Sequence, residues 1–158
     1  MQVTKQFTSD NGAYTTSTLS VEHKATKTVR TVWHLQYTDW GDAGCPTDVR
    51  SFLEFLEEMS SLRRHVHTSG SSESAAARAG GRNRNTPVMV HCSAGVGRTG
   101  VTILSDILLY CVDHNIDIDI PKVLSHLRQQ RMLMVQTLAQ YKFVHTVLIN
   151  YLKQSRLI

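Results

Sequence analysis

The residues best suited to chemistry lie between positions 87 and 100, where a cysteine, an arginine and several glycines stand close together. The apolar run Pro87–Val90 predicts a short buried strand that ends just before Cys92. Arg98 follows six residues after the cysteine, where a helix is predicted to begin. Loop amides, the positive end of a helix and a guanidinium all stabilise a thiolate and all attract a phosphate. Because thiolate is the nucleophilic form of cysteine, the segment predicts attack by sulfur on a bound phosphate.

Two other interpretations of this segment are weaker. Gly95–Gly100 matches the G-x-G-x-x-G pattern of dinucleotide-binding loops, but that fold needs a second strand ending in an acidic residue ~20 residues later. The later strand candidate, Ile116–Ile120, is short and highly charged. Cys92 also fits an ordinary buried cysteine at a strand end, and we interpret Cys111 as a buried cysteine on the apolar face of a helix. The glycines and Arg98 around Cys92 favour a reactive thiol instead.

Three segments of the chain resemble one known family. His91–Gly100 reads H-C-S-A-G-V-G-R-T-G, which resembles the H-C-x-x-G-x-x-R-[ST]-G signature of the cysteine-dependent protein tyrosine phosphatases. Trp33–Asp42 (WHLQYTDWGD) looks like the family's strand and acid-bearing loop, and Gln136–Phe143 (QTLAQYKF) looks like its glutamine-bearing loop. The residues of these motifs are most similar to those of the FERM-domain-bearing Pez branch of the non-receptor phosphatases.

The resemblance implies a role for each residue of the signature. Cys92 is the expected nucleophile, which attacks phosphorus and becomes a phosphocysteine. Arg98 is expected to clamp the phosphate oxygens, and Thr99 to ease departure of the thiolate by hydrogen bonding to it. The equatorial phosphate oxygens are expected to bind the backbone amides of a cradle made of Ser93, Ala94, Gly95, Val96 and Gly97.

The resemblance also assigns residues outside the signature. Asp42 is expected to protonate the tyrosyl oxygen as it leaves and then to act as a base toward water. Gln136 is expected to position that water, with Gln140 assisting. No metal ion or organic cofactor is expected. One departure is Gly41, which stands where the family's acid loop usually has proline, so the loop is expected to spend less time closed.

Hydrophobic periodicity predicts the elements that must position these residues. Apolar residues alternate along Thr28–Tyr37, and Val3–Phe7 and Tyr14–Val21 are further strand candidates on either side of the turn signal Asn11-Gly12. Helical spacing predicts one helix from Val49 to Leu62 with Thr47 or Asp48 as its cap, one from Val101 to Cys111, one over Pro121–Arg131 and one over Thr137–Lys153. This order predicts an α/β (α+β) fold, with a central mixed sheet flanked by helices.

The length of 158 residues suits one domain with a sizeable core. We expect residues 1–158 to form a partial phosphatase domain with its N-terminal part missing. The reason lies in the resemblance, because the family's domain begins earlier and its phosphotyrosine-stacking loop has no equivalent here. Thr68–Thr86 is a low-complexity run of small, polar and basic residues, which predicts a flexible surface loop.

Composition excludes several classes of protein. A net charge of +4 suits an anionic ligand but is too small to indicate nucleic acid as a partner. No apolar run approaches the ~20 residues of a membrane span, and the first residues lack the apolar core of a signal peptide. The three cysteines include no C-x-x-C pair, which argues against a zinc cluster and for a reducing compartment.

These expectations combine into a protein tyrosine phosphatase that hydrolyses phosphotyrosine in proteins through a phosphocysteine intermediate. The alternative is a low-activity phosphotyrosine-binding or scaffolding module, which Gly41 and the missing substrate loop favour. A dual-specificity phosphatase suits the short chain but not its W-x-D and Q-T-x-x-Q motifs. The resemblance further implies a longer parent protein with a FERM domain, located in the cytoplasm and associated with the cytoskeleton or cell junctions.

Overall fold

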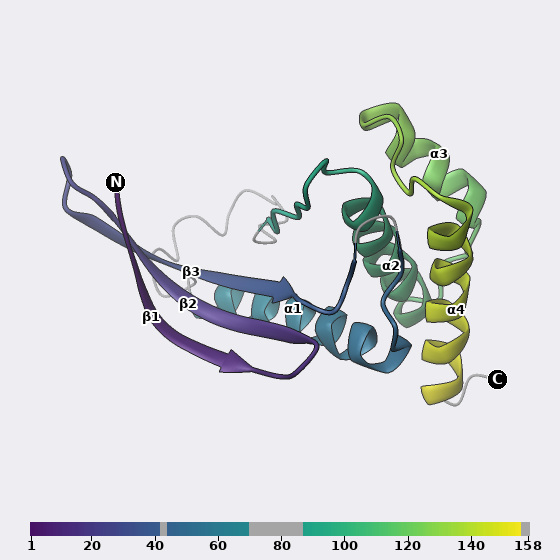
Figure 1. Ribbon diagram of the computed structural model, residues 1–158, viewed down its shortest axis with the longest axis horizontal. Helices are drawn as coiled ribbons and strands as arrows, with labels where there is room; N and C mark the ends of the chain where they lie inside the picture. Colours follow the sequence, from purple (N-terminus) through teal and green to yellow (C-terminus); the bar gives the residue numbers. More distant parts are fainter. Residues whose placement is uncertain (42–43, 70–86, 156–158) are drawn as a thin grey trace. The chain divides into compact units, whose positions relative to one another are not determined.

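The computed structural model describes residues 1–41, 44–69 and 87–155. Within these residues, three strands precede four helices (Figure 1). The strands are β1 (Gln2–Asp10), β2 (Tyr14–His23) and β3 (Thr28–Tyr37), and the helices are α1 (Val49–Ser69), α2 (Gly97–Asp113), α3 (Ile120–Gln130) and α4 (Leu138–Gln154). Among the described residues, no helix combines the length and the apolar character needed to cross a membrane.

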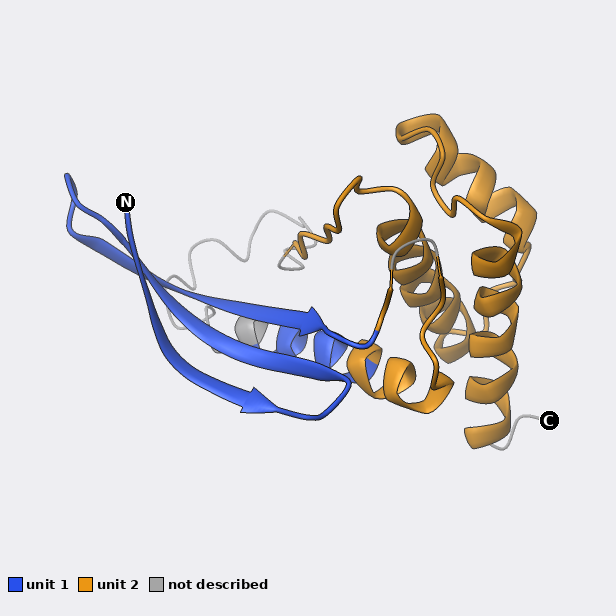
Figure 2. Ribbon diagram, in the orientation of Figure 1, with its two compact units in different colours: residues 1–39, 57–86 blue, residues 40–56, 87–158 orange. Residues whose placement is uncertain are grey.

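Contacts divide the chain into two compact units (Figure 2). Unit 1 consists of Met1–Asp39 and Glu57–Thr86, and contains the strands. Unit 2 consists of Trp40–Leu56 and Pro87–Ile158, and contains α2, α3 and α4. Helix α1 begins in unit 2 and ends in unit 1. The residues predicted to do chemistry therefore all fall within unit 2.

The strands of unit 1 form an antiparallel sheet in the order β1-β2-β3. All three predicted strands are confirmed, and β3 has the predicted bounds. The predicted turn at Asn11-Gly12 is present, with Gly12 at a φ of +83° and the side chain of Asp10 accepting a hydrogen bond from its N–H. A φ of this sign is tolerated by glycine because it has no Cβ.

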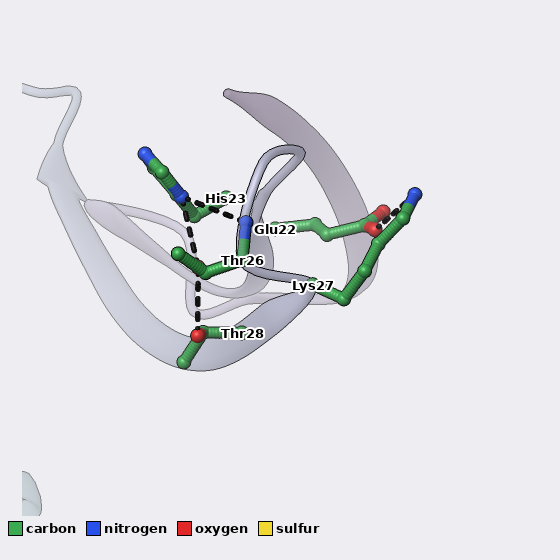
Figure 3. A network of polar contacts seen from close by, with 5 residues as sticks. All are labelled: Glu22, His23, Thr26, Lys27 and Thr28. Atoms are coloured by element: carbon green, nitrogen blue, oxygen red, sulfur yellow. Dashed lines mark hydrogen bonds and ion pairs between the residues drawn. The ribbon is translucent and has the colours of Figure 1, made fainter.

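The turn between β2 and β3 is held by a small polar network (Figure 3). The Nδ1 of His23 lies 2.9 Å from the Thr26 hydroxyl, which in turn lies 2.9 Å from the Thr28 hydroxyl. Lys27 adopts a φ of +57° and its ammonium group lies 3.4 Å from the Glu22 carboxylate. These local contacts fix the register in which β2 meets β3.

The prediction of a mixed sheet is wrong for the described residues, because the sheet contains only antiparallel pairs. The predicted buried strand at Pro87–Val90 is also absent: this segment has no regular structure, and its first three residues are exposed. A strand is stable only when its backbone groups pair with a neighbouring strand. The described part of unit 2 supplies no such neighbour, so an apolar run alone does not produce a strand.

Helix α1 begins where the sequence predicts a cap. The Asp48 carboxylate accepts hydrogen bonds from the backbone N–H groups of Arg50 at 3.1 Å and Ser51 at 2.9 Å. The Ser51 hydroxyl donates to the same carboxylate at 2.5 Å. This bond above all, and then the two backbone bonds, lower the pKa of Asp48, since they stabilise its charged form. The helix continues to Ser69, so the first two residues of the loop predicted at 68–86 are helical; the rest of that prediction lies outside the described residues.

The core of unit 2 combines an aromatic cluster with the apolar faces of α2 and α4. Trp40, Phe52 and Phe143 pack against one another, with ring centroids 5.4 to 6.4 Å apart. The helices contribute fully buried apolar side chains to the same core. These are Val101, Leu104 and Leu108 of α2 and Val144 and Val147 of α4. The cluster thus holds the start of the predicted acid loop, at Trp40, against the helices that follow the signature.

Candidate active site

The signature loop leads directly into the first turn of α2. The helix begins at Gly97, preceded by Val96 as its capping residue. Gly95 has a φ of +71°, a conformation that side chains larger than hydrogen rarely adopt, and this allows the loop to turn back toward Cys92. The turn aims backbone N–H groups and the positive end of the helix at one place, as the spacing of the signature predicts.

The sulfur of Cys92 accepts hydrogen bonds from the signature loop and from α2. The N–H of Gly95 lies 3.2 Å from it, and the hydroxyl of Thr99 lies 3.1 Å from it. Thr99 belongs to α2 and is buried, whereas Cys92 is partly exposed. The arrangement gives the sulfur donors on one side and leaves it accessible to a ligand.

The pKa of Cys92 is lowered from its ordinary value of 9.0 to about 7. Partial burial is the largest single influence and raises the pKa. Hydrogen bonds from the Thr99 hydroxyl and from the backbone N–H groups of Thr99, Gly95 and Val96 together outweigh it. The pKa of Cys45 is raised by burial, which shows what happens to a thiol without such donors.

Arg98 stands at the rim of the loop. One terminal nitrogen of its guanidinium donates to the Ser93 hydroxyl at 2.9 Å, and the other donates to the backbone carbonyl of Trp40 at 3.2 Å. The side chain therefore connects the signature loop with the first residue of the W-G-D motif. A guanidinium offers further donors in a planar fork, which suits two oxygens of one phosphate.

Both predicted glutamines lie beside Gly97. A Cβ at Gly97 would lie 3.2 Å from the side-chain oxygen of Gln136 and 3.0 Å from the side-chain nitrogen of Gln140. Gln136 is exposed and Gln140 is buried. The oxygen of Gln140 accepts hydrogen bonds from the N–H groups of Gln136 at 2.9 Å and Thr137 at 3.4 Å. Gln140 thus orders the backbone that carries Gln136.

The predicted acid, Asp42, lies outside the described residues. Its surroundings are described on both sides: Trp40 is buried and Gly41 is exposed. The indole N–H of Trp40 donates to the carbonyl of Gly44 at 2.9 Å, which closes the segment between them. The side-chain amide of Gln140 reaches the same carbonyl at 3.5 Å.

Sequence reasoning missed the contribution of the connection between α3 and α4. Arg131 donates from its guanidinium to the carbonyls of Ala94 and Gly95, in the signature loop. The N–H of Val135 donates to the carbonyl of Val96. An arginine at the end of a predicted helix carries no sequence signal for such a contact, because its partners lie more than thirty residues away.

The comparisons with known proteins agree with the motifs. The chain matches the family described as protein-tyrosine phosphatase over residues 1–150. It is 55% identical over 157 residues to tyrosine-protein phosphatase non-receptor type 21 of Rattus norvegicus, and 52% identical over 157 residues to the non-receptor type 14 protein of Homo sapiens. Both alignments cover 99% of this chain but 13% of the relative.

A receptor-type protein also matches, though at lower identity. Receptor-type tyrosine-protein phosphatase C of Rattus norvegicus is 38% identical over 139 residues, which is 87% of this chain and 10% of that protein. The matches confirm the resemblance and the α/β class that it implies. The chain belongs to the protein-tyrosine phosphatase family.

Proposed function

We propose that this chain hydrolyses phosphotyrosine in proteins through a phosphocysteine intermediate. The observation that carries the proposal is the environment of Cys92, whose sulfur accepts hydrogen bonds from Gly95 and Thr99 and has a pKa of about 7. At neutral pH, about half of such a thiol is the nucleophilic thiolate, whereas an ordinary thiol is almost entirely protonated. The names of the two non-receptor relatives, which are tyrosine-protein phosphatases, support the same substrate class.

In the first step, the Cys92 thiolate attacks phosphorus, an S–P bond forms and the bond from phosphorus to the tyrosyl oxygen breaks. We propose that Asp42 gives its proton to that oxygen, so that tyrosine leaves neutral. The backbone amides of residues 93–97 and the guanidinium of Arg98 bind the phosphoryl oxygens. Since phosphoryl transfer depends mainly on positioning and charge stabilisation, this cradle supplies most of the catalysis.

In the second step, water attacks phosphorus, the S–P bond breaks, and inorganic phosphate leaves. Asp42, now ionised, accepts a proton from the water. Gln136 orients the water, and Gln140 supports it through the hydrogen bond to the Gln136 backbone. The Thr99 hydroxyl, 3.1 Å from the sulfur, stabilises the thiolate as it departs. Every residue in this scheme belongs to the chain, and the scheme uses no metal ion or cofactor.

The test compares the chain with Cys92→Ser and with Cys111→Ser as a matched control, on a phosphotyrosyl peptide. The chain and the control are expected to release phosphate. Cys92→Ser is expected to release none, because a serine hydroxyl is scarcely ionised at neutral pH, yet it retains the cradle and binds the peptide. Turnover by Cys92→Ser comparable to the starting protein contradicts the role of Cys92. Binding without turnover by the unaltered chain supports a phosphotyrosine-binding module instead.

We also propose that the chain is part of a longer non-receptor phosphatase that carries a FERM domain and acts in the cytoplasm, near the cytoskeleton or cell junctions. The identity with non-receptor relatives, of which the chain covers only 13%, supports this. Sequencing the surrounding transcript tests the first part, since a coding region without a FERM domain contradicts it. Imaging the tagged parent protein tests the second part.

A further inference from the structure

Three successive carbonyls of the cradle accept hydrogen bonds from the connection between α3 and α4. The guanidinium of Arg131 donates to Ala94 at 3.2 Å and to Gly95 at 2.9 Å. The backbone N–H of Val135 donates to Val96 at 3.1 Å. Arg131 also packs closely on the loop, since a Cβ at Gly95 would lie 3.3 Å from its terminal nitrogen.

Peptide planarity gives these bonds a consequence on the other side of the loop. In a trans peptide, the carbonyl of one residue and the N–H of the next point in opposite directions. Carbonyls of Ala94 and Gly95 that point to Arg131 therefore turn the N–H groups of Gly95 and Val96 away from it. The N–H of Gly95 indeed points at the sulfur of Cys92, 3.2 Å away.

The loop needs an external restraint of this kind because Gly95 lies at its turn. Glycine adopts positive and negative φ with similar ease, so the peptide before it can flip at little steric cost. A flipped peptide would present a carbonyl oxygen, rather than an N–H, to an anion in the cradle. Two hydrogen bonds from one planar guanidinium hold both adjacent peptides in the productive orientation.

We infer that Arg131 is a positioning residue: it touches neither sulfur nor phosphate, but aims the cradle amides of Gly95 and Val96 at both. The inference rests on the proposed function at one point, which is that the anion bound by these amides is the phosphoryl group of a substrate. Arg131 is exposed, so a substitution there opens no cavity in the core. Lysine carries the same positive charge but lacks the planar guanidinium that can donate to two carbonyls at once. Arg131→Lys should therefore keep only part of the contribution of Arg131.

The experiment measures alkylation of Cys92 by iodoacetamide as a function of pH, with the modified peptide identified by mass spectrometry. The variants are Arg131→Met, Arg131→Lys and Arg50→Met, and the last removes an exposed arginine of α1 as a matched control. A second measurement records how much inorganic phosphate protects Cys92 from alkylation. Neither measurement requires turnover.

Arg131→Met is expected to move the alkylation midpoint upward from about 7 toward 9.0, and to weaken protection by phosphate. Each effect should be roughly tenfold, the value of one lost hydrogen bond to a charged group. For Arg131→Lys, the alkylation midpoint and the protection by phosphate should lie between those of Arg131→Met and the starting protein. For Arg50→Met, both should equal those of the starting protein. A residue with a merely structural role would change the unfolding midpoint without moving the pH midpoint of a folded variant.

An unchanged pH midpoint and unchanged phosphate protection in folded Arg131→Met overturn the inference. Should that variant fail to fold, Arg131→Lys decides alone, and values equal to those of the starting protein overturn it. The outcome is separable from that of the proposed function. A shifted midpoint in a chain that hydrolyses no phosphotyrosyl peptide upholds the role of Arg131 and contradicts the phosphatase activity.

Discussion

The hydroxyl of Thr99, buried in α2, donates a 3.1 Å hydrogen bond to the sulfur of Cys92. The two residues are seven positions apart with the signature loop between them in the sequence, so the bond ties the start of that loop to α2. The bond stabilises the sulfur when it is negative, which in the proposed mechanism is its state before attack and again after the phosphoryl group leaves.

Removing this hydroxyl should make the thiol less acidic. Thr99→Val is expected to raise the pKa of Cys92 from about 7 by roughly one unit, because a hydrogen bond to a charged group contributes about 1.5–3 kcal/mol and partial exposure reduces that value. Iodoacetamide alkylation followed over pH measures the shift. Thr102→Val is the control, since its hydroxyl bonds the Arg98 carbonyl and not the sulfur. Equal shifts in both variants would contradict the assignment.

Folding stability should rise with pH as Cys92 loses its proton. The pKa of Cys92 is about 7 in the folded chain against an ordinary 9.0, so between these values the unfolded chain binds more protons. The added stability is fully present above pH 9 and is lost as pH falls through 7. Urea unfolding at a series of pH values measures it, as the difference between the chain and Cys92→Ser.

Taking the difference in unfolding free energy between the chain and Cys92→Ser also cancels the contributions of other titratable groups. Burial raises the pKa of Cys45, which destabilises the folded chain only at higher pH and acts equally in both proteins. A difference that stays constant from below pH 7 to above pH 9 would show that the folded thiol is not unusually acidic.

The elements and the site were predictable to different degrees, for physical reasons. Alternation along Thr28–Tyr37 predicted the bounds of β3, because successive side chains of a strand face opposite sides of the sheet. The run Pro87–Val90 was misread because a strand also needs a partner, which lies outside its own sequence. Cys92, Arg98 and the glycines were predictable since they are neighbours in the chain.

The supporting residues were not predictable in this way. Arg131 and the carbonyl it bonds in Gly95 are thirty-six positions apart, and nothing in the residue type predicts that pairing. Contacts of this kind depend on how elements pack, which local patterns do not encode.

A methyl group at Gly100 should destabilise unit 2. A Cβ there would overlap the backbone nitrogen of Val135 and would lie 3.0 Å from the carbonyl carbon of Met134. Backbone cannot yield as a flexible side chain can, so Gly100→Ala is expected to cost about 1–3 kcal/mol of unfolding free energy, against a helix-propensity gain of at most ~1. Thermal unfolding measures the loss. Gly41→Ala is the matched control, because a Cβ at Gly41 meets nothing within 4 Å.

Restricting the acid loop should raise turnover if Asp42 is the acid. Gly41→Pro narrows the open conformations of the chain just before Asp42, an effect worth ~0.4–1 kcal/mol where the backbone permits it. That corresponds to about a two- to fivefold shift toward closure. kcat on a phosphotyrosyl peptide should rise accordingly, and kcat on an aryl phosphate with a more acidic leaving group should rise less. Equal gains on both substrates, or no gain on either, would mean that closure does not limit the reaction.

The bond from the Trp40 indole to the Gly44 carbonyl has a consequence for how this loop can vary in length. Surface loops ordinarily accept inserted residues at little cost. Here the two ends are joined to each other, and the ring that joins them is buried against Phe52 and Phe143. An insertion would have to bulge outward from a fixed base or break the bond and leave a buried indole N–H unpaired. Residues of this loop can therefore be substituted far more readily than new residues can be inserted.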